Sequence, residues 1–166
     1  YLIGIGPGNP DYLTLQAINT MKKVDVFFIL EKGERKGYRE FIDIRKEILE
    51  RYLDRGTYRV VSARIPQRKK SGNSYKEGVK TWRGQKAGVI TELIEERMKD
   101  SEIGAFLIWG DPSLYDGHLE ILQHILKKGA VNFEYEVIPG ITSVQVLAEK
   151  HKTPLNRIGE TIVITT

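Results

Sequence analysis

The strongest constraint on the fold of this chain is a regular alternation of short apolar runs with helix-like segments. The runs have the length and continuity of strands covered on both faces, and the segments between them repeat apolar residues at helical spacing. Such alternation favours an α/β fold with a mostly parallel sheet and flanking helices. We expect strands at 1–5, 24–30, 57–63, 105–109, 133–138 and 161–165, and helices at 13–23, 38–53, 79–99, 119–128 and 143–151.

Local residues predict where some of these elements begin and end. Thr14 or Asp11 is expected to cap the first helix, because short polar side chains accept hydrogen bonds from the first helical N–H groups. Gly129 is expected to end the helix before it, since glycine adopts the left-handed conformation that terminates helices. The polar segment 64–78 has no apolar periodicity and is expected to be a loop.

Three of the expected strands end in loops that contain glycine, at 4–8, 110–112 and 139–140. In open parallel sheets, ligands bind outside the carboxyl ends of the strands. These loops are therefore the expected site of the chain.

The first loop has a composition that argues against phosphate binding. Its glycines at 4, 6 and 8 alternate, whereas the dinucleotide fingerprint needs Gly-x-Gly-x-x-Gly. Pro7 removes one N–H donor and Asp11 would repel a phosphate. The loop is compatible either with a tight turn that binds nothing or with a turn that admits an uncharged or zwitterionic ligand.

The other two loops offer complementary polar groups. Asp111 could face an ammonium group or cap the following helix, and the sequence favours the cap. Thr142 and Ser143 lie at an expected helix start, where hydroxyl and N–H groups could hold a carboxylate. An ammonium and a carboxylate together would suit an amino-acid moiety.

Composition excludes several classes of protein and site. The chain has no apolar run long enough to span a membrane and shows no visible signal peptide. It has no cysteine, which excludes disulfides and thiolate metal sites and is compatible with a cytoplasmic protein. The histidines at 118, 124 and 151 lack ligand-like neighbours. We therefore expect no metal site and interpret them as surface or helix residues.

The three loops, taken together, resemble the motifs of the tetrapyrrole methylases, a family that uses S-adenosylmethionine (SAM). The matching segments are GIGPGNPDYLTL at 4–15, GDPSLYDG at 110–117 and IPGITSV at 138–144. The resemblance implies SAM as cofactor and S-adenosylhomocysteine as product. The positions that match the family's cofactor contacts are Pro7, Gly110, Asp111, Leu114, Thr142 and Ser143.

Three further segments, 26–34, 105–115 and 154–159, are similar to family members that act in cobalamin (corrin) biosynthesis. The resemblance implies a cytoplasmic, homodimeric C-methyltransferase with a small tetrapyrrole substrate and neither nucleic acid nor membrane as partner. Two alternatives stay open. One is another SAM-dependent methylase of this fold, acting on a different precorrin, on diphthine or on ribosomal RNA, and the other is a fragment without catalysis.

The resemblance also implies a domain organisation. Family members have two α/β domains and bind SAM in the cleft between them. By this likeness, 1–151 is the N-terminal domain, 152–160 is a linker and 161–166 begins a truncated second domain. We therefore expect this chain alone to be inactive.

Catalytic and substrate-binding candidates are less sharply defined. Some family members carry an aspartate, proposed as a proton acceptor, where this chain has Leu30. The neighbouring Glu31 is the candidate base, although a one-residue offset reverses the face of a strand. Arg64, Arg68 and Lys69 lie in the basic stretch 64–83 and are candidates for binding substrate carboxylates. A solvated loop and a nucleic-acid surface remain alternatives there, although stacking aromatics are sparse.

Overall fold

A computed structural model describes residues 1–31, 38–67 and 75–165 of the chain. Its centre is a five-stranded sheet with the order β3-β2-β4-β1-β5. Every pairing between these strands is parallel, which confirms the expected α/β class. The strands are β1 (Leu2–Gly4), β2 (Val26–Glu31), β3 (Arg59–Arg64), β4 (Gly104–Ile108) and β5 (Val137–Ile138).

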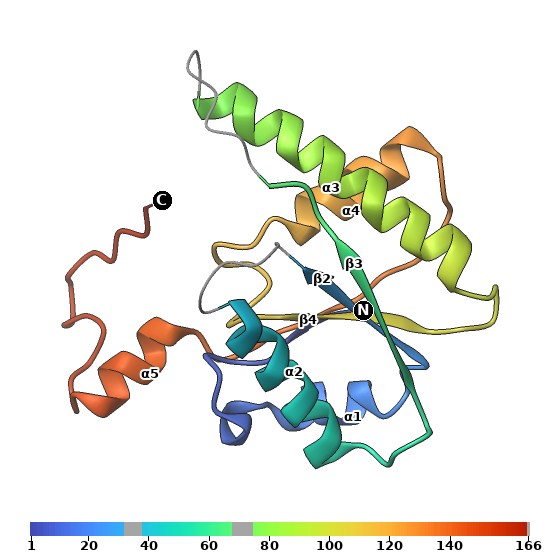
Figure 1. The fold of residues 1–166 in the computed structure, drawn as a ribbon. Helices are drawn as coiled ribbons and strands as arrows, with labels where there is room; N and C mark the ends of the chain where they lie inside the picture. Colours follow the sequence, from blue (N-terminus) through green and yellow to red (C-terminus); the bar gives the residue numbers. More distant parts are fainter. Residues whose placement is uncertain (32–37, 68–74, 166) are drawn as a thin grey trace.

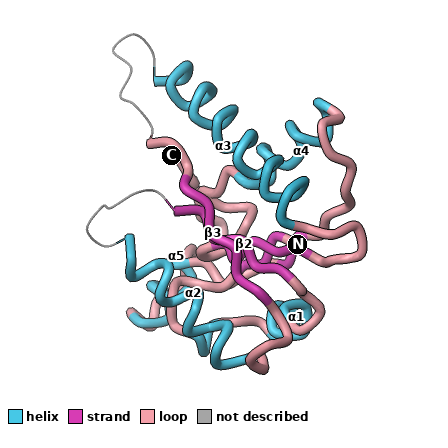
Figure 2. Tube along the Cα trace, turned by 45° about the vertical axis from the view of Figure 1, so that its right-hand side comes forward, coloured by secondary structure: helices cyan, strands magenta, loops and turns pink. Residues whose placement is uncertain are grey.

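Helices cover both faces of the sheet. The helices α3 and α4 pack on one face, and α1 and α2 pack on the other (Figures 1 and 2). A short 3-10 helix, η1, lies between β1 and α1, and α5 follows β5. The bounds are η1 (Pro10–Tyr12), α1 (Leu15–Met21), α2 (Tyr38–Tyr52), α3 (Tyr75–Arg97), α4 (His118–Lys128) and α5 (Ser143–Lys150).

The central strands are buried on both faces. Along β4, Phe106 and Ile108 join the core beneath α3 and α4, while Ala105 and Leu107 join the core beneath α1 and α2. Successive side chains of a strand point to opposite faces, so a strand with helices on both sides needs apolar residues at every position. This is why these strands appear in the sequence as continuous apolar runs.

The expected helix ends are formed as local chemistry predicts. The Thr14 hydroxyl accepts a hydrogen bond from the Ala17 N–H at 3.0 Å and caps α1. Asp11, the alternative cap, lies instead in η1 and forms an ion pair with Arg51 of α2 at 2.5 Å. Gly129 ends α4 with φ of 66°, which only glycine adopts without cost.

The structure corrects three expected elements. The strand expected at 133–138 is confined to Val137–Ile138, because Phe133 and Tyr135 pack against the core beneath α3 and α4. The prediction of a loop over 64–78 is wrong at its C-terminal end, because α3 begins at Tyr75. The first turn of that helix is polar, so apolar periodicity does not detect it. No strand forms at 161–165, where the chain is exposed.

The C-terminal part of the chain is exposed. No residue of α5 is buried, and residues 151–165 run outside the layered body of the molecule (Figure 1). The expected linker and second domain remain predictions. Across the described residues, the structure holds no helix with the length and apolar character that a membrane crossing requires.

Candidate functional site

The three glycine loops meet at one junction at the carboxyl edge of the sheet. A Cβ atom added at Gly4 would lie 2.5 Å from the backbone nitrogen of Gly140. A Cβ added at Gly140 would lie 2.9 Å from the Cα of Gly4 and closer still to the carbonyl oxygen of Gly110. Gly6 and Gly110 also exchange backbone hydrogen bonds of 3.2 and 2.8 Å. The loops approach so closely that glycine is required where they touch.

Asp111 ties the central loop to the third loop. Its Oδ2 accepts the Gly140 N–H at 2.9 Å, and its Oδ1 accepts the backbone N–H of Ser113 at 2.8 Å and the Ser113 hydroxyl. Burial alone would raise the pKa of Asp111, but these hydrogen bonds outweigh it and hold the pKa below its ordinary value. The interpretation of Asp111 as a helix cap is wrong, because α4 begins after Gly117 without a side-chain cap.

A cavity of about 340 Å³ opens beside this junction, at the carboxyl ends of β2 and β4. Pro7 is not among its lining residues. However, the next residue, Gly8, packs against Trp109, and the Trp109 side chain lines the cavity. The other positions matching the family's cofactor contacts all line it, namely Gly110, Asp111, Leu114, Thr142 and Ser143.

Thr142 contributes to the cavity from the start of α5. Its hydroxyl accepts the Gln145 N–H at 3.3 Å, and the Gln145 side chain accepts the Thr142 N–H at 2.8 Å. This capping box fixes the helix start against the third loop. Because the Thr142 hydroxyl is engaged in the cap, the carboxylate-binding role of Thr142 and Ser143 stays a prediction.

A charged cluster forms another wall of the cavity, from α3 and from the segment that leads into α4. It consists of Lys86, Asp116 and His118, all of which line the cavity. Nδ1 of His118 lies 2.7 Å from Oδ1 of Asp116, which also accepts the His118 backbone N–H at 2.7 Å. Lys86 is only 5% exposed. The cluster thus brings together one buried and two largely buried ionisable side chains on the same wall.

Burial and the neighbouring charges fix the protonation states of this cluster. Burial lowers the pKa of His118, and the positive charge of Lys86 acts in the same direction. The hydrogen bond that His118 donates to Asp116 opposes both, but the pKa stays below its ordinary value. Burial would raise the pKa of Asp116, but His118 and Lys86 hold it below its usual range. At neutral pH Asp116 is therefore ionised and His118 is neutral. Since a carboxylate only accepts, the His118 proton lies on Nδ1.

The sequence does not predict this cluster. The expectation that His118 is a surface or helix residue holds only in part, because His118 begins α4 but is largely buried and lines the cavity. A signal was present, because Asp116 and His118 stand two residues apart at the end of the central motif. Lys86 is far away in the sequence and no local pattern pointed to it.

The helix α2 supplies a third side of the cavity. Arg45 donates from Nε to the Leu107 carbonyl at 2.9 Å and from Nη1 to the Phe41 carbonyl at 2.7 Å. The rings of Phe41 and Trp109 stand edge to face with centroids 4.8 Å apart. The cavity therefore combines aromatic surface with cations from helices on both faces of the sheet.

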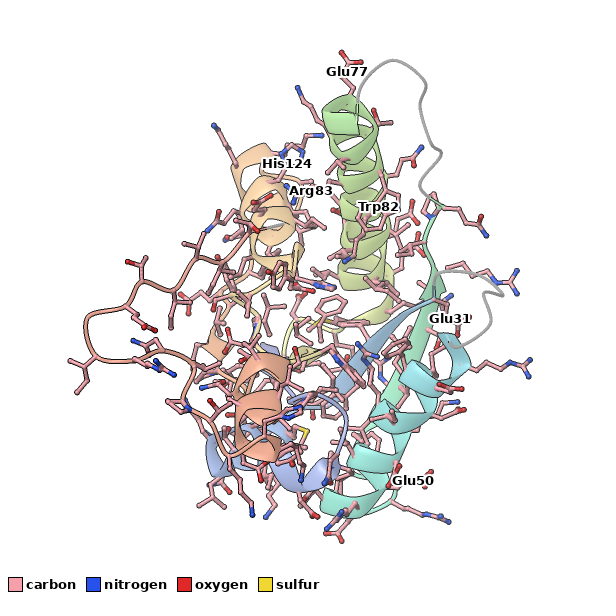
Figure 3. All side chains as sticks on the ribbon, turned by 90° about the vertical axis from the view of Figure 1, so that its left-hand side faces the viewer. Glu31, Glu50, Glu77, Trp82, Arg83 and His124 are labelled. Carbon is pink, nitrogen blue, oxygen red and sulfur yellow. The ribbon has the colours of Figure 1, made fainter. Side chains whose placement is uncertain are left out.

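The remaining predicted residues lie apart from the cavity lining or outside the described residues. Glu31 ends β2 and pairs in register with Arg64 of β3 at the side of the sheet (Figure 3). Because β2 continues through Glu31, that side chain faces away from Leu30, which lines the cavity. Arg64 is exposed. Arg68 and Lys69 fall outside the described residues, so all these roles stay predictions.

No group of three or more histidine and acidic side chains suited to a metal ion occurs within residues 1–31, 38–67 and 75–165.

Comparison with solved structures identifies the same architecture in other proteins. A cobalamin-synthesis-related protein, CobF, from Corynebacterium diphtheriae matches 97% of this chain and 60% of its own chain, with a TM-score of 0.73 and 33% identity. The cobalt precorrin-4 methyltransferase CbiF matches 95% of this chain and 52% of its own, with a TM-score of 0.56 and 19% identity. The second likeness concerns the fold alone.

Sequence comparison gives a consistent result. A precorrin-6A synthase [deacetylating] from Sinorhizobium sp is 43% identical over 165 residues, which are 99% of this chain and 62% of the relative. A uroporphyrinogen-III C-methyltransferase from Methanobacterium ivanovii is 27% identical over 86% of this chain and 49% of its own length. The chain thus spans about half to two thirds of the length of these relatives. The model of the Tetrapyrrole (Corrin/Porphyrin) Methylases matches residues 1–166, and the chain belongs to this family.

Proposed function

We propose that this chain is the N-terminal part of a SAM-dependent C-methyltransferase of corrin biosynthesis. The proposed reaction is methylation of precorrin-5 at C-1 with loss of acetate, giving precorrin-6A. The observation that carries this proposal is the cavity itself, because five residues expected from the family's cofactor contacts line it together. The 43% identity to a precorrin-6A synthase supports the choice of substrate.

The residues at the glycine junction fit the cofactor. SAM, when bound, supplies a methyl group carried on a positively charged sulfur. A Cβ added at Gly110 would meet no atom within 4 Å, so the backbone there is open to close approach, and the ionised Asp111 beside it favours a positive charge. The Trp109 ring adds a face that attracts cations. Pro7, Leu114, Thr142 and Ser143 would complete the contacts from the surrounding loops.

The cations around the cavity fit a substrate that carries many carboxylates. Lys86 and Arg45 line the cavity itself. Arg64, Arg68 and Lys69 are proposed to bind further carboxylates of the substrate, and Glu31 stays the candidate proton acceptor that the sequence suggests. Alignment of the two reactants is the main task of such an enzyme, since positioning can supply roughly 7–11 kcal/mol of the barrier.

The organisation of the whole protein is part of the proposal. The relatives are longer than this chain, and a second α/β domain after 152–160 would close the cofactor cleft. This chain alone would then be inactive, and the full-length protein would act as a cytoplasmic homodimer. Its partner would be a small tetrapyrrole, with neither nucleic acid nor membrane involved.

Turnover by the full-length protein tests the proposed reaction. With precorrin-5 and SAM, mass spectrometry should show precorrin-6A and S-adenosylhomocysteine, with one acetate released for each turnover. Methylation of uroporphyrinogen III or another precorrin, without turnover of precorrin-5, would contradict the assignment and favour another methylase of this fold.

A separate experiment tests the candidate substrate-binding cations. Changing Arg64, Arg68 and Lys69 together to Ala should raise the KM for precorrin-5 while leaving the affinity for S-adenosylhomocysteine unchanged. An unchanged KM would show that these cations do not bind the substrate.

A further inference from the structure

The imidazole of His118 presents a free lone pair to the cavity. Its Nδ1 is held by Asp116, and Nε2 has no hydrogen-bond partner among the described residues. Among the described residues, every fully buried side-chain nitrogen or oxygen has a hydrogen-bond partner, so an atom without one is not fully buried. Nε2 must therefore reach open space, and the open space that His118 lines is the cavity.

The proposed reaction requires a base at such a position. Release of acetate means that water adds to the carbonyl carbon of an acetyl group and that the carbon–carbon bond to the macrocycle breaks. Water at neutral pH is a poor nucleophile, and a positioned base that accepts its proton accelerates such a step by about 100-fold to 10,000-fold. The residues matching the family's cofactor contacts offer no neutral base for this purpose.

We propose that His118 is the general base that activates water for acetate release, and that Asp116 positions it. This inference rests on the proposed function. Asp116 holds the proton on Nδ1 and fixes the orientation of the ring, so that Nε2 accepts. The ring of Phe106, whose centroid lies 5.3 Å from that of His118, supports the imidazole from the sheet.

The step is balanced in protons and electrons. The water oxygen bonds to the acetyl carbon while one water proton passes to Nε2 of His118. The tetrahedral adduct collapses to acetic acid, and the electron pair of the broken bond stays on the macrocycle carbon, which becomes the nucleophile that is methylated. Acetic acid and His118 then release their protons to solvent. No oxidant or reductant is needed.

The charges around His118 suit this role. Lys86 of α3 and Arg45 of α2 line the same cavity, and both act against protonation of His118, whereas Asp116 favours it. The same two cations would attract the negative charge that develops on the acetyl oxygen as water adds. The site therefore keeps the base neutral and also favours the anionic adduct.

The decisive variant is His118→Asn in the full-length protein. The asparagine amide can still donate to Asp116, but it offers no basic nitrogen. The rate of acetate release from precorrin-5 should fall by about 100-fold or more, with the affinity for S-adenosylhomocysteine unchanged. The matched control is His124→Asn, because His124 is exposed on the same helix and lies beside Arg83 between α3 and α4 (Figure 3). The control should retain the wild-type rate.

Two readouts separate a base from a structural residue. The wild-type rate should fall as the pH drops below neutrality, and in Asp116→Asn this limb should move because the partner of Nδ1 has changed. In ¹⁵N NMR spectra, the His118 resonances, assigned by comparison with His118→Asn, should show a neutral ring with its proton on Nδ1 at pH 7. A charged ring at pH 7 would overturn the proposal. A wild-type rate independent of pH across this range would also overturn it, and that measurement holds even if the variant fails to fold.

The outcomes distinguish this inference from the proposed function. Wild-type protein that does not consume precorrin-5 overturns both. Wild-type protein that releases acetate, with His118→Asn retaining the rate within about threefold, overturns the role of His118 and leaves the proposed function standing.

Discussion

Two walls of the cavity are built on different physical principles. The loop wall, formed by Gly110, Asp111, Thr142 and Ser143, is held by backbone contacts and by hydrogen bonds to backbone groups. The charged wall, formed by Lys86, Asp116 and His118, is held by contacts between ionisable side chains. Substitutions in the loop wall should thus act mainly by steric clash or loss of hydrogen bonds, and they should lower the free energy of unfolding. Substitutions in the charged wall should act mainly on protonation and on the reaction rate, with smaller effects on the free energy of unfolding.

The largest effect is expected at the glycine junction. In Gly140→Ala the new Cβ would meet backbone atoms of Gly4 and Gly110, which cannot rotate away. We expect the free energy of unfolding, measured in urea, to fall by about 3 kcal/mol, at the upper end for overpacking.

The control is Gly84→Ala on α3, where an added Cβ meets no atom within 4 Å. It should raise stability by up to about 1 kcal/mol. Equal stabilities of the two variants would disprove the steric account of the junction.

Loss of the Asp111 carboxylate should have the next largest effect. Asp111→Ala leaves the Gly140 N–H without the acceptor that joins the two loops. An unsatisfied, partly buried donor costs about 1–3 kcal/mol, and urea unfolding should show a loss in that range. Asp100→Ala, at an exposed turn, should change stability by less than about 0.5 kcal/mol. If the two variants behave alike, Asp111 does not hold the loops together.

The pH dependence of stability should show the lowered pKa values of His118 and Asp116 in the charged wall. The folded pKa of His118 lies below its unfolded value of about 6.5, so the unfolded chain binds the proton more tightly. Stability should therefore fall as the pH drops below about 6.5. The lowered pKa of Asp116 acts with the same sign in more acidic solution, below about pH 4.

Thermal unfolding followed between pH 5 and 8 should thus show a slope in the wild type that His118→Asn reduces. The matched control is His124→Asn, at an exposed position of the same helix. A slope that survives in His118→Asn would mean that another group titrates.

The smallest effect is expected at the ion pair that links the first loop to α2. Arg51 and Asp11 are 2.5 Å apart, but both side chains are about half exposed or more. Exposed ion pairs contribute about 0–1 kcal/mol. Arg51→Ala should therefore lower the free energy of unfolding by less than about 1 kcal/mol, and less in high salt. A loss as large as that of Asp111→Ala would contradict the small contribution expected of this exposed ion pair.

The sequence predicted the loop wall because its determinants are local. Glycines after strands, the helix start at Ser143 and the ending of α4 at Gly129 all depend on neighbours within a few residues. The parallel sheet followed from the continuous apolar runs of its central strands. Asp111 was misjudged because its partner, the Gly140 N–H, lies 29 residues away.

The complete charged wall could not be predicted, because Lys86 is distant in the sequence from the local pair Asp116 and His118. Lys86 lies on α3 and His118 at the start of α4, and only the packing of those helices on one face of the sheet brings the two together. Segments that lack a regular period were also misjudged. Phe133 and Tyr135 pack on a core instead of pairing in a strand, and the polar first turn of α3 resembles a loop.

The central claim is that this cavity binds the cofactor of a methyltransferase. Leu114 lines the cavity, so Leu114→Asp places a second carboxylate beside Asp111 and removes apolar contact. Leu15 of α1 is 78% exposed, and Leu15→Asp is the matched control. Titration calorimetry of S-adenosylhomocysteine into the full-length protein should show binding by the wild type and the control, weakened at least about tenfold in Leu114→Asp, equivalent to about 1.4 kcal/mol. No binding by the wild type, or equal binding by Leu114→Asp, would contradict the claim.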